Sequence, residues 1–173
     1  MDLKSIIRSV PDFPKPGIVF RDITPLVLNV AARTQVANEL ADAFRDARPD
    51  VVVGIDARGF VIGALVADRL SLGLALVRKK GKLPYQTVSA SYELEYGTDT
   101  VEMHSDAVTP GQRVLVIDDL LATGGTAGAT CELVEKLGGT VVGCGFIIEL
   151  SFLNGRDKLK GRRVDALIDY PSE

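Results

Sequence analysis

The sequence predicts an α/β protein in which helices flank a central, mostly parallel β-sheet. Residues 51–55 and 114–117 are runs dominated by valine, isoleucine and leucine, which is typical of strands buried on both faces. A helical pattern follows each run, and glycines separate that helix from the next apolar run. Strands alternating with helices imply right-handed crossovers and a ligand site beyond the carboxyl ends of the strands.

The N-terminal arm, residues 1–30, is expected to be an appendage to the sheet. Residues 2–10 have apolar side chains at helical spacing and predict a short amphipathic helix. Three prolines between positions 11 and 16 follow. Because proline fixes its own backbone and restricts the residue before it, we expect residues 11–25 to be extended and without regular structure.

The first half of the core follows the arm. Residues 31–45 place apolar side chains on one face of a helix. The strand at 51–55 comes next, then a helix at 59–70 that ends near Gly73, and then a strand at 74–77.

The second half of the core repeats this alternation. A strand at 113–118 leads into a helix over 125–137, which the pair Gly138-Gly139 ends. Apolar runs at 140–148 and 164–168 predict the last two strands.

Residues 79–99 differ from the rest because they are polar, aromatic and glycine-containing, without core periodicity after Leu83-Pro84. A connection of this length inside a compact domain is usually functional, and we expect a long mobile lid. With no repeat or linker in view, residues 1–173 are expected to form a single domain.

The composition excludes several classes of protein. The net charge of −3, from 20 basic and 23 acidic residues, argues against a nucleic-acid or polybasic membrane partner. The two cysteines, Cys131 and Cys144, lie in apolar patterns, and with His104 as the one histidine there is no zinc-ligand cluster. His104 is expected at the surface of a strand edge. The N-terminus has no apolar signal core, so we expect a cytoplasmic protein.

The most informative motif is a strand that ends in Asp118 and Asp119, then a short loop, then a helix start. The loop residues are Ala122, Thr123, Gly124, Gly125 and Thr126. Backbone N–H groups of such a loop and the helix N-terminus favour a phosphate, and the carboxylates can accept hydrogen bonds from vicinal sugar hydroxyls. A plain tight turn would explain the glycines but not the acidic pair. Walker A and dinucleotide loops fit less well, since threonine stands where the Walker lysine belongs.

This stretch resembles the binding motif for 5-phosphoribosyl 1-pyrophosphate (PRPP) in type I phosphoribosyltransferases. The resemblance continues through residues 14–22, 57–60, 78–84 and 92–97, in the same order and over nearly the whole chain. It implies the type I phosphoribosyltransferase fold, with the N-terminal arm as a hood over the site and residues 79–99 as the lid.

Two cationic segments lie at the same predicted sheet edge as the loop. Ala57 and Arg58 open a helix at the end of a strand and form a second anion cradle. Residues 78–82 contain four cations, and such a cluster is more often a solvated charge run. Because this cluster lies at the same predicted sheet edge as both anion-binding loops, we expect it to bind an anion. The resemblance implies that Ala57, Arg58, Arg78, Lys79 and Lys82 hold the leaving pyrophosphate. It also implies a cis peptide bond, for which Asp56–Ala57 is the expected place.

The base and its proton are assigned by resemblance. The resemblance implies that Glu95 is the catalytic carboxylate that takes or shares the proton of the base and that Tyr96 closes over the site. Glu93 and Glu95 would point to the same face of a strand, so alternation alone does not choose between them. The resemblance also makes Phe20 stack on the purine, while backbone groups near Val19 and Arg21 read the edge of the base.

The reaction implied is the transfer of phosphoribose from PRPP to adenine, giving AMP and pyrophosphate. A 6-amino group needs an acceptor, whereas a 6-oxo group would want a donor such as lysine, and Lys15 is the one candidate in the hood. No protein metal site is predicted, and Mg²⁺ is expected to be held mainly through PRPP oxygens. The family forms homodimers. Two alternatives stay open: another base (xanthine, guanine or hypoxanthine), and a regulator that senses PRPP or nucleotides on the same fold.

Overall fold

The structure is a computed structural model that describes residues 1–94 and 96–173. The strands are β1 (Arg8–Pro11), β2 (Val19–Asp22), β3 (Val51–Ile55), β4 (Gly73–Lys79), β5 (Thr87–Glu93), β6 (Thr98–His104), β7 (Arg113–Leu121), β8 (Thr140–Leu150) and β9 (Val164–Tyr170). The α-helices are α1 (Thr24–Leu28), α2 (Val30–Phe44), α3 (Arg58–Leu70) and α4 (Gly125–Lys136). None of the helices in this described part is both long and apolar enough to cross a membrane.

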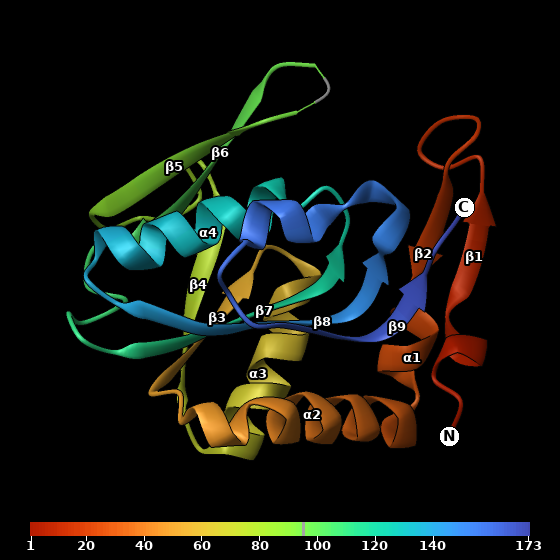
Figure 1. The fold of residues 1–173 in the computed structure, drawn as a ribbon, viewed down its shortest axis with the longest axis horizontal. Helices are drawn as coiled ribbons and strands as arrows, with labels where there is room; N and C mark the ends of the chain where they lie inside the picture. Colours follow the sequence, from red (N-terminus) through yellow and green to blue (C-terminus); the bar gives the residue numbers. More distant parts are fainter. Residues whose placement is uncertain (95) are drawn as a thin grey trace.

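Seven strands form the main sheet, in the order β5-β6-β4-β3-β7-β8-β9. The five strands from β4 to β9 pair in parallel, and β5 and β6 add an antiparallel hairpin at one edge. Figure 1 shows α4 on one face of this sheet and α2 with α3 on the other. The predicted α/β fold, with a mostly parallel sheet between helices, is therefore confirmed.

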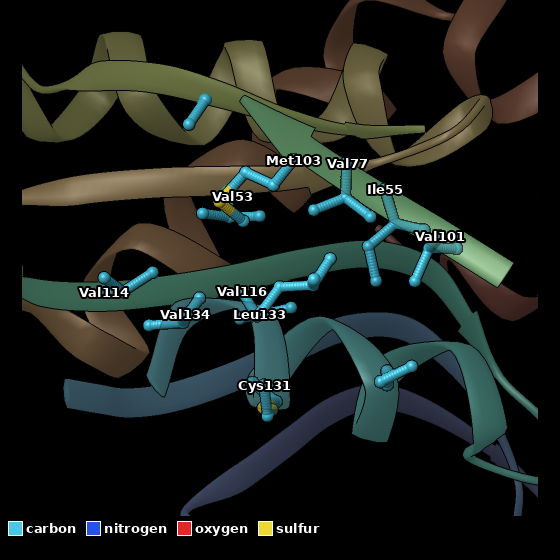
Figure 2. Close-up of a cluster of buried hydrophobic side chains, with 14 of the residues drawn as sticks. Val53, Ile55, Val77, Val101, Met103, Val114, Val116, Cys131, Leu133 and Val134 are labelled. Carbon is cyan, nitrogen blue, oxygen red and sulfur yellow. The ribbon is translucent and has the colours of Figure 1, made fainter. Parts of the chain in front are cut away.

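The core is split by the sheet into two layers. Val53 and Ile55 of β3 pack toward α4, and Figure 2 shows them in the same cluster as Leu133 of that helix. Val52 lies in the opposite layer, against α2 and α3. Since successive side chains of a strand point to opposite faces, both layers need apolar residues, and β3 becomes a continuous apolar run with all five residues buried.

The N-terminal arm differs from its prediction. A helix over residues 2–10 is wrong, because a short 3-10 helix at Lys4–Ile6 gives way to strand β1. Leu3 and Ile7 are buried at 6% and 8% exposure, and their spacing of four suited a helix equally well. Strand β1 pairs antiparallel with β2 in a separate two-stranded sheet.

Residues 11–25 also have regular structure, contrary to the expectation for that segment. The prolines are confined to places where a proline costs little: the end of β1, the loop between the strands, and the first turn of α1. The peptide bond between Phe13 and Pro14 in that loop is cis. Both termini lie beside this hairpin in Figure 1.

The expectation that residues 79–99 lack core periodicity is wrong. Strand β5 and the start of β6 lie in this segment, as part of a hairpin that projects from the sheet in Figure 1. Ala90 and Val101, which pair across the hairpin, are 4% and 1% exposed. The alternation was hidden because serine, threonine and charged residues take the outward positions.

The other predicted helices and strands are confirmed within a few residues at their ends. The exception is β7, which was expected to end at Asp118 and instead continues to Leu121. Its register with β8 extends through this segment, with Leu121 opposite Glu149. The acidic pair therefore lies near the end of a strand that is still paired with β8, and this pairing holds the backbone of the pair rigidly.

Candidate active site

A cavity of about 240 Å³ lies beyond the carboxyl ends of β3 and β7. It is lined by Asp56, Ala57, Arg58, Lys79 and residues 118–127. The structure thus brings together the acidic pair, the predicted phosphate loop, the second anion cradle and one lysine of the basic run. This is the place at which a parallel α/β sheet binds ligands.

The loop after β7 presents backbone N–H groups to the cavity. Gly124 precedes α4 at φ +82°, a conformation that glycine adopts without penalty. A β-carbon there would lie 2.3 Å from the carbonyl oxygen of Gly155, so a larger residue would also collide. Among the described residues, no side chain caps the N-terminus of α4. Its first N–H groups and the helix dipole are therefore available to an anion.

The second cradle lies at the N-terminus of α3. The peptide bond between Asp56 and Ala57 is cis, as predicted. Gly59, in the first turn, lies so close to β7 that a β-carbon there would be 2.7 Å from Asp118 Oδ1. This close approach sets the two helix N-termini side by side at one cavity.

The two carboxylates have different surroundings. Asp119 is 4% exposed, and Arg58 Nε donates a hydrogen bond to its Oδ2 at 2.5 Å. Asp118 Oδ1 accepts the backbone N–H of Asp119 at 2.8 Å. Burial, and next the negative charge of Asp119, raise the pKa of Asp118 well above its usual value. Asp119 therefore has a cationic partner, whereas the surroundings of Asp118 favour the protonated form of its carboxyl.

Arg58 stays charged in this setting. Burial alone would lower its pKa, but the hydrogen bond to Asp119 and the nearby carboxylates raise it. Its side chain is 47% exposed, so part of the guanidinium remains open to a ligand. Arg58 can hold Asp119 and an anionic ligand at the same time, because it has five donors.

The basic run is only partly brought to the cavity. Lys79 lines it, but Arg78 and Lys82 do not. Neighbouring residues of a strand point to opposite faces, and Arg78 instead bonds to Asp56 through Nε at 3.2 Å. Lys82 is exposed in the turn after β4. The expectation that these three cations face one ligand together is not met in this conformation.

Of the predicted base-binding residues, Phe20 lies beside the cavity, whereas Val19 and Arg21 contact the C-terminal segment. The ring centre of Phe20 is 5.5 Å from the Arg58 guanidinium carbon, which places β2 next to α3. The Val19 N–H donates to Glu173 Oε2 at 3.0 Å. Arg21 stacks on the Tyr170 ring, with its guanidinium carbon 4.0 Å from the ring centre. The arm thus covers the edge of the site near Arg58.

The predicted lid residues are not gathered at the cavity. Glu95 lies outside the described residues. Tyr96 is 83% exposed, and Glu93, at the end of β5, is exposed as well. Tyr92 and Asp99, which the sequence analysis did not assign, contact Lys79. The signal that identifies them is cross-strand register, which a sequence alone does not give.

Two further expectations concern metals and His104. In residues 1–94 and 96–173, no three or more His, Cys, Asp or Glu side chains gather closely enough to hold a metal ion. His104 is half-buried at the end of β6, not a surface residue as expected, and its ring lies 6.0 Å from that of Tyr85.

Comparisons with known proteins show the family of this chain. Residues 27–168 match the phosphoribosyl transferase domain family. An adenine phosphoribosyltransferase of Rubrobacter xylanophilus is 57% identical, over 97% of this chain and 91% of its own. The crystal structure of the corresponding enzyme from Thermoanaerobacter pseudethanolicus superposes with a TM-score of 0.95 at 50% identity, covering 98% of each chain. The enzyme from Saccharomyces cerevisiae, crystallised with an imino-altritol bisphosphate and adenine, gives 0.90 at 39% identity, covering 96% of each chain.

Proposed function

Because the chain belongs to the adenine phosphoribosyltransferases, within the phosphoribosyl transferase domain family, we propose that it transfers phosphoribose from PRPP to adenine. The products are AMP and pyrophosphate, and the reaction salvages a purine base. The observation that supports this most directly is the cavity itself, where two uncapped helix N-termini, a carboxylate pair and two cations meet. PRPP offers a matching phosphate, two ribose hydroxyls and a pyrophosphate.

We assign the 5-phosphate to the loop at the start of α4. Backbone N–H groups from Thr123 to Thr126 and the two threonine hydroxyls supply the donors. The ribose hydroxyls then lie over Asp118 and Asp119. Hydrogen bonds donated by the ribose hydroxyls would favour the ionised form of Asp118 and so oppose the burial that raises the pKa of this carboxyl.

The pyrophosphate is assigned to the other end of the cavity. Ala57 offers a backbone N–H at the α3 N-terminus, and Arg58 and Lys79 supply charge. As the bond from C1 to the pyrophosphate breaks, negative charge grows on the leaving oxygen and the ribose becomes cationic. Fixed cations and backbone dipoles at this end lower the energy of that state. Arg78 would join only if it left Asp56, and Lys82 only if the turn after β4 moved toward the ligand.

The base is assigned to the edge of the cavity beside Phe20. Its ring can stack on adenine next to Arg58, and backbone groups of Val19 and Arg21 can then read the 6-amino edge. Glu95 is proposed to take or share the proton of the base as the ring nitrogen attacks the ribose, with Tyr96 closing the site. Both assignments come from the family resemblance.

Mg²⁺ is proposed to enter as part of the substrate, bound to PRPP. The protein offers two neighbouring carboxylates, one of which already holds Arg58. This donor set fits an ion that keeps most of its oxygen ligands from PRPP and water. Bound in that way, Mg²⁺ would neutralise part of the pyrophosphate charge, while Arg58 and Lys79 neutralise the remainder.

A homodimer is the proposed assembly. Val61 on α3 and Leu76 on β4 are large apolar side chains that remain 44% and 37% exposed on neighbouring elements. A groove of about 440 Å³ beside β4 continues this apolar surface. We expect light scattering to give twice the chain mass and Leu76→Glu to reduce it toward that of one chain.

Free thiols at both Cys131 and Cys144 are in keeping with a reducing, cytoplasmic setting.

Steady-state assays with PRPP, Mg²⁺ and a panel of bases test the proposed function. We expect AMP and pyrophosphate to form in equal amounts from adenine, with far lower kcat/KM for hypoxanthine, guanine and xanthine. Equal activity on hypoxanthine would assign the enzyme to another base. Binding of PRPP or AMP with no turnover of any base would instead favour the alternative of a sensing regulator.

A further inference from the structure

We propose that Tyr92 is a positioning residue that fixes Lys79 relative to the phosphate-binding loop. This inference rests on the proposed role of Lys79 in binding pyrophosphate. Tyr92 lies on β5 directly opposite Asp99 on β6, and Lys79 of β4 lies opposite Val101. Since residues two apart on a strand share a face, the three polar side chains are placed on the same side of the sheet.

The three side chains form a closed set of hydrogen bonds. Lys79 Nζ donates to Tyr92 Oη at 2.9 Å, and Tyr92 Oη donates to Asp99 Oδ2 at 3.1 Å. Lys79 Nζ also donates to Asp99 Oδ2 directly. An ammonium group has three donors, so two are used by these partners and the third remains for a ligand in the cavity.

The same tyrosine contacts the other end of the site through its ring. A β-carbon at Gly125, the first residue of α4, would lie 2.7 Å from Tyr92 Cδ2, so the ring packs directly on that backbone. Gly125 and Lys79 both line the cavity. Tyr92 is thus one rigid side chain between the predicted 5-phosphate loop and the predicted pyrophosphate lysine.

The hydroxyl group is what gives Lys79 a defined direction. The Lys79 and Asp99 side chains are 45% and 33% exposed, and an ion pair in such partly hydrated surroundings is weak and loosely oriented. A lysine side chain is also flexible, so binding an anion costs it conformational freedom. A second partner on a ring that packs against Gly125 restricts that freedom before PRPP binds.

Tyr92→Phe tests this without changing charge, because it removes the hydroxyl and keeps the ring on Gly125. We expect the KM for PRPP to rise roughly threefold to tenfold, the net effect of one ordinary hydrogen bond in partly hydrated surroundings. The KM for adenine, kcat and the melting temperature should change little. Tyr85→Phe is the matched control, since Tyr85 is 59% exposed and lies against His104, outside the cavity.

Lys79→Met, alone and combined with Tyr92→Phe, separates this inference from the role of Lys79. We expect Lys79→Met to raise the KM for PRPP and Tyr92→Phe to add nothing in that background. If Lys79→Met raises the KM but Tyr92→Phe does not, the positioning role is overturned and the role of Lys79 stands. If Lys79→Met has no effect, both are overturned. A Tyr92→Phe effect that persists without Lys79, or appears equally in both KM values, would mean a merely structural contact and also overturn the inference.

Discussion

Replacement of Arg58 by methionine removes the guanidinium beside Asp119 and keeps an unbranched side chain at the start of α3. Arg58 Nε lies 2.5 Å from Asp119 Oδ2, and the Asp119 side chain is 6% exposed. Without the arginine, a buried carboxylate loses its cationic partner. We therefore expect two separate losses, one of stability from the uncompensated charge and one of activity from the missing contact to pyrophosphate.

The size of the stability loss follows from the burial of the two partners. Breaking a fully buried pair costs about 3–5 kcal/mol, whereas an exposed pair contributes about 0–1 kcal/mol. Here one side chain is buried and the other is 47% exposed. We expect a value between these limits, about 2 kcal/mol, which corresponds to a fall in Tm of about 4–8 °C for a chain of this size.

Thermal melts of Arg58→Met and of the double variant with Asp119→Asn measure this directly. The neutral amide removes the buried charge, so the double variant should recover most of the lost stability, while kcat/KM for PRPP stays at least about a hundredfold below that of the unmodified enzyme. Arg69→Met on the same helix is the control, since its carboxylate partner Asp68 is 79% exposed and no buried charge is left without a partner, so the Tm should shift little. An unchanged Tm in Arg58→Met, or no recovery in the double variant, would refute the reasoning that Arg58 neutralises Asp119.

Three further variants test other parts of the site. Asp118→Asn removes a carboxyl whose pKa is raised from 3.8 by burial and by Asp119. The folded protein holds that proton more tightly than the unfolded chain, so its contribution to stability is complete below pH 3.8 and is lost as the pH rises through the raised pKa. At a pH above the raised pKa of Asp118, we expect the Asp118→Asn variant to have a higher Tm than the unmodified protein and to bind PRPP less well. A lower Tm of the variant in that pH range would contradict this. Gly124→Ala places a β-carbon 2.3 Å from the Gly155 carbonyl oxygen at φ +82°. We expect the free energy of unfolding, measured with a denaturant, to fall by about 1–3 kcal/mol and most of the PRPP affinity to be lost. Retention of both would show that the loop tolerates other backbone conformations. Glu95→Gln should lower kcat by roughly a hundredfold to ten-thousandfold while PRPP binding by calorimetry changes little, and unchanged turnover would remove Glu95 from the mechanism.

The central strands and the anion loops could be predicted because their signals are local. The buried stretches of the central strands, residues 51–55 of β3 and 114–117 of β7, carry no polar side chain since both faces are covered. The loop from Ala122 to Thr126 shows its glycines and threonines directly. The arm could not be predicted in the same way. Leu3 and Ile7 face the core, but whether they do so from a helix or from an irregular segment depends on strand β2 pairing with β1.

The arrangement of side chains inside the site depends on the register between strands. The sequence does not reveal that register, so the contacts of Lys79 could not be predicted. Arg78 and Lys79 are equivalent as members of a charge run, yet strand alternation lets only Lys79 line the cavity. Tyr92 and Asp99 meet Lys79 because β5, β6 and β4 pair in one register. A shift of one residue in either pairing would separate them, and no pattern within a single strand reveals that pairing.

A crystal structure of the enzyme with AMP tests the central assignment most directly. We expect the 5-phosphate to accept hydrogen bonds from backbone N–H groups of residues 123–126, the ribose hydroxyls to lie on Asp118 and Asp119, and adenine to stack on Phe20. A phosphate held instead at Arg58 and Lys79, with the base away from Phe20, would contradict it.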